Sequence, residues 1–180
     1  MKFSIESFLE MGSPIHFKKK EHILRYGEVS RNVYFVVEGV VRHYVIDYLG
    51  NEKTIRLSQE NDFFYSSNIS YWKGDASYIN CQALLNTRLL SWTKHQLDHL
   101  SSIEPAFVLF ESNKLREFIM EKHKKEISSI TKNAEERLLE FSETNIDLFN
   151  RIPNHIIASY LDMTPETLSR LRAKFKNPKS

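Results

Sequence analysis

The stretch Ile156–Phe175, "IIASYLDMTPETLSRLRAKF", predicts two short helices joined by a tight turn. The first helix begins near Pro153 and Asn154 and ends at Asp162. Glycine is the usual residue at such a turn because it accepts a left-handed backbone, and aspartate tolerates that backbone better than most residues. Apolar side chains at helical spacing are expected to pack the two helices together: Ile157, Ala158, Leu161, Met163, Leu168, Leu171 and Phe175.

The second helix has a clear start signal and an outer face suited to DNA. Thr164 is a good N-cap, Pro165 a good first residue, and Glu166 favours the positive end of a helix. Arg170 can donate two hydrogen bonds to guanine and Glu166 can accept one from cytosine, each contact giving about 1–3 kcal/mol of discrimination. Phosphate contacts are expected from Ser169, Arg172 and Lys174. The candidate DNA-binding residues are Thr164, Pro165, Glu166, Thr167, Ser169, Arg170, Arg172 and Lys174.

The charge of the chain is uneven. The segment 151–180 has six lysine and arginine residues against two acidic ones, a formal charge of +4 in a chain whose total is +2. A basic end on a near-neutral body suggests a polyanionic partner such as nucleic acid, although a solvated basic terminus has the same composition.

The first hundred residues predict short strands separated by glycines. "NVYFVVEGVVRHYVID" indicates two strands around Gly39, and "DYLGNEKTIRLS" a turn at Gly50 followed by a strand. "PIHFKKKEHILRYGE" indicates an early pair of strands that ends at Gly27, and "SYINCQALLNTRLLSW" two more strands that are interrupted near Asn86. This spacing is typical of a sandwich or jelly-roll barrel.

After Trp92 the pattern becomes helical. A long helix is expected from Pro105 to about Ser129, about 35–40 Å at 1.5 Å per residue. Its exposed stripe could pair with a second copy of the chain, or the helix could pack along its own sheet. The next helix, "TKNAEERLLEFSETN", is expected to use Thr131 as its N-cap, and "IDLFNRIP" is expected to be a short connection.

Several classes of protein and site are disfavoured. No run of eighteen apolar residues and no signal peptide is present, and Cys81 is the only cysteine, so the chain is expected in the cytoplasm. His95 and His99 lie four residues apart, but no third metal ligand accompanies them. His43 and Cys81 lie in predicted strands and give little support for haem. No catalytic motif is recognised, and the sequence predicts no cofactor, no metal site and no enzymatic activity.

The chain resembles the Crp/Fnr transcriptional regulators, in particular a short-tailed group common in Bacteroidetes-type bacteria. "LRYGEVSRNVYFVVEGVVRHYVIDYLGNEKT" is similar to the cyclic-nucleotide-binding β-roll, "NAEERLLEF" to the helix that enters the DNA-binding domain, and "IASYLDMTPETLSRLR" to the helix-turn-helix. Glu166, Ser169 and Arg170 fall on the E-x-x-S-R positions that read bases in Fnr-like members. The resemblance implies a homodimer joined through the long helix, a pseudo-palindromic double-stranded DNA site and RNA polymerase as a further partner.

The expected fold class is therefore α+β. It comprises a β-roll sensor domain over residues 1–100, which is a double-stranded β-helix of the jelly-roll type, a long dimerisation helix over 101–130 and a helix-turn-helix domain over 131–180. Only "KNPKS" remains after the recognition helix, so the β-hairpin wing of better-known members is not expected.

The effector pocket of the family looks altered. Ser66-Ser67 fall near the Gly-Glu pair, and Ser77-Tyr78 near the Arg-Ser pair, that hold a cyclic nucleotide in the family. No arginine lies between Leu57 and Thr87, and a buried phosphate without a cation is costly, so ordinary cAMP binding is not expected. Either a different small effector or a closed, empty pocket remains open. The candidate pocket residues are Phe64, Ser66, Ser67, Ser77 and Tyr78.

One alternative function is left open by the sequence. A cupin-like or sensor protein would use the β-roll to bind another small molecule and the C-terminal helices to bind a protein. Steep salt dependence of DNA binding would separate a DNA reader from such a protein-binding helix pair.

Overall fold

The computed structural model describes residues 3–176 and divides into two compact units. The first unit comprises Met1–Val45 and Ile55–Glu117, and the second comprises Ile46–Thr54 and Phe118–Ser180. The second unit therefore combines a short segment from the strand-rich part of the chain with the C-terminal helices.

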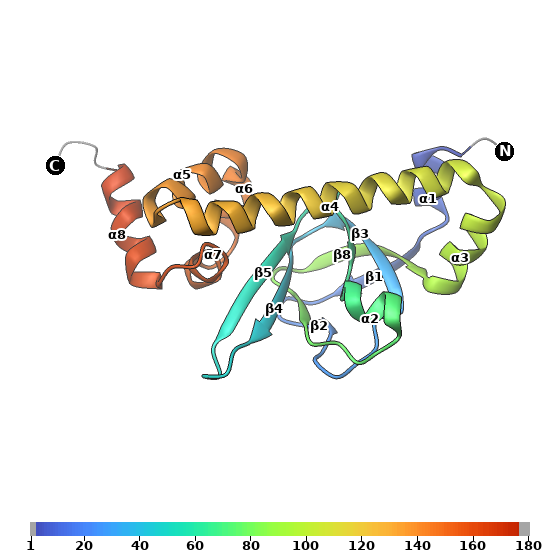
Figure 1. Cartoon of the computed structure of the whole chain (residues 1–180), viewed down its shortest axis with the longest axis horizontal. Helices are drawn as coiled ribbons and strands as arrows, with labels where there is room; N and C mark the ends of the chain where they lie inside the picture. The colour runs from blue at the N-terminus through green and yellow to red at the C-terminus, as the bar shows by residue number, and fades with distance from the viewer. Residues whose placement is uncertain (1–2, 177–180) are drawn as a thin grey trace. The chain divides into compact units, whose positions relative to one another are not determined.

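The strands form two four-stranded antiparallel sheets (Figure 1). One sheet has the order β1 (Ser13–Phe17), β8 (Thr87–Thr93), β3 (Asn32–Glu38) and β6 (Phe63–Tyr65). The other has the order β2 (His22–Leu24), β7 (Asn80–Ala83), β4 (Val41–Ile46) and β5 (Glu52–Ser58). The strands predicted around Gly39, Gly50 and Asn86 and before Gly27 are all present.

Consecutive strands mostly belong to different sheets. The predicted strands on either side of Gly39, β3 and β4, do not pair, because the chain crosses there from one sheet to the other. Gly39 has φ +107°, and a Cβ atom at this position would lie 2.4 Å from the hydroxyl oxygen of Thr87, so only glycine fits the crossing. By contrast, β4 and β5 are neighbours in one sheet and turn at Gly50, which has φ +84°.

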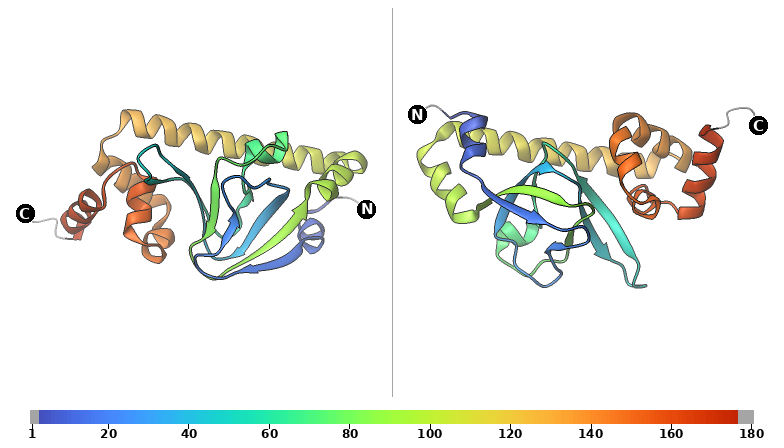
Figure 2. Two further views of the ribbon diagram at one scale, coloured as in Figure 1. Left: turned by 90° about the horizontal axis from the view of Figure 1, so that it is seen from below. Right: turned by 180° about the vertical axis from the view of Figure 1, so that it is seen from behind.

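The apolar core of the first unit has two parts. One cluster lies between the two sheets, which form the walls of a roll in Figure 2, and it contains buried side chains from both: Leu24, Tyr34, Val36, Val41, Phe64, Cys81 and Leu89. The other is aromatic and involves α1 (Ile5–Glu10), α3 (Lys94–Ile103) and the start of α4 (Pro105–Thr131). Phe8 stacks on Trp92 there, with ring centroids 4.5 Å apart. A further short helix, α2 (Asn68–Lys73), follows β6.

The long helix begins at Pro105, as predicted, and ends at Thr131. The prediction that Thr131 caps the next helix is wrong. Its hydroxyl donates to the Ile127 carbonyl at 2.7 Å within α4, and Asn133 forms a capping box with Glu136 instead. Asparagine is as good an N-cap as threonine, so the sequence alone did not distinguish the two.

Four helices follow in the second unit: α5 (Ala134–Thr144), α6 (Ile146–Arg151), α7 (Asn154–Tyr160) and α8 (Pro165–Lys176). The segment predicted as a plain connection is thus the short helix α6, which buries Leu148. These elements share an apolar core made of Leu138, Phe141, Leu148, Ile152, Ile156, Ile157, Ala158, Leu161, Leu168 and Leu171. The predicted α+β class, with a jelly-roll, a long helix and C-terminal helices, is confirmed. The expected absence of a wing concerns residues beyond Lys176, outside the described part of the chain.

Candidate nucleic-acid interface

The start of α8 is fixed by Thr164. Its hydroxyl oxygen accepts from the Thr167 amide at 3.2 Å, and its carbonyl accepts from the Leu168 amide at 3.0 Å. Pro165 is the first residue of the helix, where a missing N–H costs nothing. The predicted N-cap is therefore correct, and it sets the direction in which α8 leaves the turn.

The turn before α8 has a left-handed residue. Asp162 has φ +52°, and the Met163 amide donates to the Ala158 carbonyl at 3.0 Å. Arg137 of α5 binds this turn from the side, because its guanidinium donates to the carbonyls of Leu161 at 2.9 Å and Asp162 at 3.2 Å. The role of Arg137 was not predicted, since no local pattern in "NAEERLLEF" distinguishes it from a surface arginine.

The inner faces of α7 and α8 are packed as the sequence predicts, except that Met163 is only half-buried and Phe175 is exposed. Ile157, Ala158 and Leu168 are each 0% exposed, so the small Ala158 side chain lies inside the packed helix pair. Phe175 is 38% exposed and is not part of this core. It lies near the end of α8, more than one turn beyond Leu171.

The outer face of α8 presents Glu166, Ser169 and Arg170 to solvent. Arg170 makes no hydrogen bond or ion pair with any other residue in the described part of the chain, so its guanidinium is available to a ligand. The pKa of Glu166 is lowered by hydrogen bonds from its own backbone amide and from the Thr164 hydroxyl. Glu166 is therefore an ionised acceptor at neutral pH, and the three side chains form a polar ridge that carries both signs of charge.

Two of the predicted phosphate-binding residues have partners within the chain. Arg172 donates to the Asn154 side chain and lies 4.0 Å from the Phe149 ring centroid, so it joins α8 to α6 and to the start of α7. Lys174 pairs with Glu135 of α5, with Nζ–O distances of 2.7 and 2.9 Å. The Lys174 pair is exposed, and such pairs contribute only about 0–1 kcal/mol, so Lys174 can exchange Glu135 for a phosphate.

The turn between β4 and β5 contacts α7 within the second unit. The Ser159 hydroxyl accepts from the Thr54 amide at 2.9 Å and donates to the Glu52 carbonyl at 3.1 Å. Lys125 of α4 donates to the Thr54 carbonyl at 3.4 Å and lies 4.2 Å from the Tyr160 ring centroid. Burial lowers the pKa of Lys125, and Asp162 partly offsets this effect. These contacts were not predicted because their partners are distant in the sequence.

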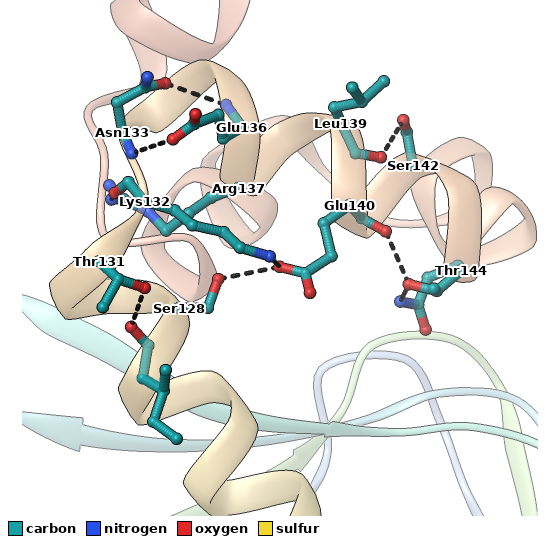
Figure 3. A network of polar contacts seen from close by, with 12 residues as sticks. Ser128, Thr131, Lys132, Asn133, Glu136, Arg137, Leu139, Glu140, Ser142 and Thr144 are labelled. Carbon is teal, nitrogen blue, oxygen red and sulfur yellow. Dashed lines mark hydrogen bonds and ion pairs between the residues drawn. The ribbon is translucent and has the colours of Figure 1, made fainter.

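The junction between α4 and α5 is also held by polar contacts (Figure 3). Glu140 of α5 accepts from the Ser128 hydroxyl at 2.9 Å and pairs with Lys132 at 3.0 Å. These two hydrogen bonds lower the pKa of Glu140. Together with the Asn133 capping box, they fix the angle at which the chain passes from the long helix into the C-terminal helices.

The predicted effector-pocket residues divide into two groups in the first unit. Phe64 is 1% exposed and stacks on Tyr34, and the Ser66 hydroxyl bonds that of Ser30 at 2.8 Å. Both border His43, whose ring meets Phe64 edge-on at 5.1 Å. The buried Ser67 precedes α2 and makes no side-chain capping bond.

The remaining two pocket candidates lie in the loop between α2 and β7. The Ser77 hydroxyl donates to the Ile79 carbonyl at 2.9 Å and so stabilises its own loop. Tyr78 is 64% exposed and its ring lies against Tyr26.

A cation that was not predicted lies near His43. Arg56 of β5 donates to the Phe63 carbonyl at 3.3 Å and acts electrostatically on His43 and Cys81. Burial and, to a smaller extent, Arg56 lower the pKa of His43 to about 3, against a hydrogen bond with the Ser66 backbone that raises it. Burial raises the pKa of Cys81. The interior of the roll therefore holds a neutral imidazole and a neutral thiol at physiological pH.

A metal cluster and a membrane-spanning helix are both absent from the described residues. No group of three or more histidine, cysteine, aspartate or glutamate side chains lies close enough to hold a metal ion. No helix within the described range is long and apolar enough to cross a membrane.

Comparison with known proteins places these features in a family. The model of the cyclic nucleotide-binding domain matches residues 14–103, which is half of the chain. No curated protein matches the sequence. Among solved structures, FixK2 from Bradyrhizobium japonicum is similar with a TM-score of 0.80 and 20% identity, over 93% of this chain and 86% of that one.

Two further structures are described as regulators. CLP of Xanthomonas campestris, a c-di-GMP-responsive global regulator, has a TM-score of 0.73 and 15% identity, over 97% of this chain and 91% of its own. A transcriptional regulator of the CRP/FNR family from Thermus thermophilus has a TM-score of 0.68 and 20% identity, over 93% and 87%. The chain therefore belongs to the cyclic nucleotide-binding domain family, with the whole-chain fold of Crp/Fnr-type transcriptional regulators.

Proposed function

We propose that the protein is a homodimeric, sequence-specific DNA-binding transcription regulator that does not require cAMP. The observation that carries this proposal is the ridge of Glu166, Ser169 and Arg170 on α8. The ridge is exposed and Arg170 has no partner among the described residues, whereas the helix beneath it is held by Thr164 and by Arg137 bound to the turn. A rigid helix with a free polar face is what insertion into a major groove requires.

The contacts of the α8 side chains indicate a different role for each of them. Arg170 is free to donate two hydrogen bonds to a guanine, and Glu166 to accept from a cytosine. Arg172 positions α8 through Asn154 and Phe149, so we assign it a structural role in addition to any phosphate contact. Lys174 binds phosphate after its exposed pair with Glu135 opens.

Dimerisation is supported by the outer surface of α4. Six large apolar side chains are exposed along it, at spacings that keep most of them on one side of the helix: Val108, Leu109, Ile119, Met120, Ile127 and Ile130. Such a stripe is costly in water, and a second copy of the same helix would cover it. Two recognition helices related by the resulting two-fold axis would read a pseudo-palindromic site with half-sites about 34 Å apart.

The β-roll interior supports the proposed independence from cAMP. The Ser66 and Ser77 hydroxyls, which fall at the positions of the nucleotide-binding pairs, are already bonded to Ser30 and Ile79. A cyclic phosphate would need a cation where these serines stand, and Arg56, the cation near His43, is bonded to the Phe63 carbonyl. RNA polymerase as a partner and a different small effector remain predictions from the sequence.

The experiment is selection of the full chain against a randomised DNA pool, without effector, at two salt concentrations. Enrichment of a two-fold symmetric site is expected, and its affinity should fall steeply with salt because phosphate contacts release counterions. Arg170→Ala should abolish the enrichment. Arg88→Ala, which removes an equal charge from an exposed pair with Glu38, is the matched control and should leave it unchanged. Enrichment that survives Arg170→Ala would show that α8 is not the reader, and binding of a protein instead would support the alternative.

A further inference from the structure

Three aromatic rings in the first unit form the walls of a cage. Tyr65 comes from β6, and Tyr71 and Trp72 come from α2. The Tyr65 and Tyr71 centroids are 4.7 Å apart with the planes at 60°, and those of Tyr71 and Trp72 are 5.2 Å apart at 85°. Tyr65 and Trp72 are 5.9 Å apart at 46°. The rings are steeply inclined to one another and pack edge to face instead of forming a parallel stack.

A cation already lies on these rings. The ammonium nitrogen of Lys94, the first residue of α3, is 5.3 Å from the centroid of Tyr71 and 5.3 Å from that of Trp72. Both distances are within the range in which the negative face of an aromatic ring attracts a positive charge. The chain thus uses this surface to hold one of its own cations.

Two carboxylates complete the cage. Asp98 pairs with Lys94 at 2.9 and 3.1 Å, and Glu111 of α4 accepts from the Tyr65 hydroxyl at 3.2 Å. Burial raises the pKa of Glu111, and the charge of Asp98 acts in the same direction while that of Lys94 opposes it. Asp98 and Glu111 are therefore close enough to Lys94 to share its charge, and one ammonium group faces two acidic groups.

The cage is open to solvent on the side of its movable members. Tyr71 is buried, but the Trp72 residue is 48% exposed and the Lys94 and Asp98 side chains are 40% and 60% exposed. The Lys94–Asp98 pair joins residues four apart on an exposed helix face, a type of pair that contributes about 0.3–0.5 kcal/mol. The four-carbon stem of Lys94 can rotate away without disturbing the rings, because only its ammonium group holds it in place.

We infer that the cage of Tyr65, Tyr71, Trp72, Asp98 and Glu111 is a binding site for small quaternary ammonium compounds, and that Lys94 is its internal occupant. A quaternary cation is weakly hydrated and presents methyl groups to the Tyr71 and Trp72 rings, on which the Lys94 ammonium lies, so it gains more from the cage than a primary ammonium does. The two carboxylates exclude anions and supply the counter-charge. The inference is independent of the proposed DNA binding.

The test is titration of the full chain with tetramethylammonium chloride, followed by calorimetry and by the NMR signal of the Trp72 indole N–H. Sodium chloride at the same ionic strength is the blank. Saturable binding is expected in the unmodified chain. Lys94→Met, which keeps the stem and removes the competing charge, should tighten it about tenfold. Lys114→Met is the matched control, because Lys114 forms an exposed pair with Glu117 on α4 and should leave the affinity unchanged.

Two substitutions in the cage should act in the opposite direction. We expect about tenfold weaker binding of tetramethylammonium to each of two variants, Trp72→Leu and Glu111→Gln. The first removes an aromatic ring, and the second removes a negative charge and keeps all three rings. Glu111→Gln retains an acceptor for the Tyr65 hydroxyl, so an altered fold cannot explain its effect. Failure of Lys94→Met to raise the affinity, or binding that is unaffected by both Trp72→Leu and Glu111→Gln, would overturn the inference. Neither result would bear on DNA binding, which is measured without the titrant.

Discussion

Ser159 of α7 and Thr54 of β5 are 105 residues apart in the sequence, yet the Ser159 hydroxyl accepts from the Thr54 amide at 2.9 Å. The same hydroxyl donates to the Glu52 carbonyl, so a single side chain satisfies two backbone groups of the β4–β5 turn. Ser159→Ala leaves the buried Thr54 amide without this acceptor and should reduce the free energy of unfolding by about 1–2 kcal/mol. Urea denaturation followed by circular dichroism measures this change in the free energy of unfolding. Ser142→Ala, whose hydroxyl bonds only the Leu139 carbonyl one turn earlier, should have a smaller effect.

Arg170 and Arg172 are two positions apart on α8 and should respond differently to alanine. Arg170→Ala should weaken binding to the selected DNA site by about 1–3 kcal/mol while leaving thermal stability unchanged, because the side chain forms no hydrogen bond or ion pair with another described residue. Arg172→Ala should lower stability, since it removes the contacts with Asn154 and Phe149. Fluorescence anisotropy with labelled DNA and thermal melting separate the two effects. Equal losses of stability would contradict the assignment.

The stability of the protein should depend on how well residue 162 tolerates a left-handed backbone. Asp162→Ala places a less tolerant residue at φ +52° and should destabilise the protein by about 1 kcal/mol. Asp162→Gly removes the steric cost, and it should be more stable than the alanine variant at pH 7 although both lose the carboxylate near Lys125. Because both variants lack the carboxylate, the difference between their free energies of unfolding reports the steric cost of the left-handed backbone alone. A glycine variant less stable than the alanine one would rule out the steric explanation.

The buried His43 should make stability depend on pH. Its pKa is about 3 in the folded protein against 6.5 for the free side chain, so below pH 6.5 the unfolded chain binds a proton that the folded chain does not. Stability should therefore fall as the pH is lowered from 6.5 toward 3, with a slope of up to about 1.4 kcal/mol per pH unit from this group. Denaturation midpoints at pH 7, 6 and 5 measure the slope. His43→Gln should reduce the dependence of stability on pH. An unchanged slope would show that other groups are responsible.

The exposed stripe of α4 predicts the oligomeric state. Ile119→Glu should convert the dimer to a monomer at micromolar concentration, because a charge would be buried in the seam between the two helices. Sedimentation velocity distinguishes the species. Lys122→Glu, a substitution at another exposed position of the same helix, should remain dimeric. A monomeric unmodified chain would instead require another partner for Val108, Leu109, Ile119, Met120, Ile127 and Ile130.

The features predicted correctly from the sequence are those with a local physical cause. Glycines at left-handed positions mark the turns at Gly39 and Gly50, Pro105 marks the start of α4, and Thr164-Pro165 marks the start of α8. Helical spacing of apolar residues identifies the core of α7 and α8. In these cases the residue that marks a turn or a helix start lies within a few residues of the feature that it marks.

The features that were missed depend on tertiary contacts. Arg56 approaches His43 from a neighbouring strand, and Arg137 reaches a turn 24 residues away, so neither is distinguishable from a surface arginine in the sequence. The strands flanking Gly39 were correct as elements, but their assignment to separate sheets depends on pairing with strands distant in the sequence, β8 for β3 and β7 for β4. The short helices α1, α2 and α6 have too few residues to show a helical period.

The β4–β5 turn gives the protein an unusual partition of its chain. The polypeptide leaves the first unit after Val45, contributes Ile46–Thr54 to the second unit, and returns at Ile55. No single backbone cleavage can therefore release either unit intact. A C-terminal fragment that begins at Phe118 would lack this inserted segment, and Ser159 and Lys125 would meet solvent where they now meet β5. A faithful isolated copy of the second unit would have to be engineered as a circular permutant or supplied with the turn as a separate peptide.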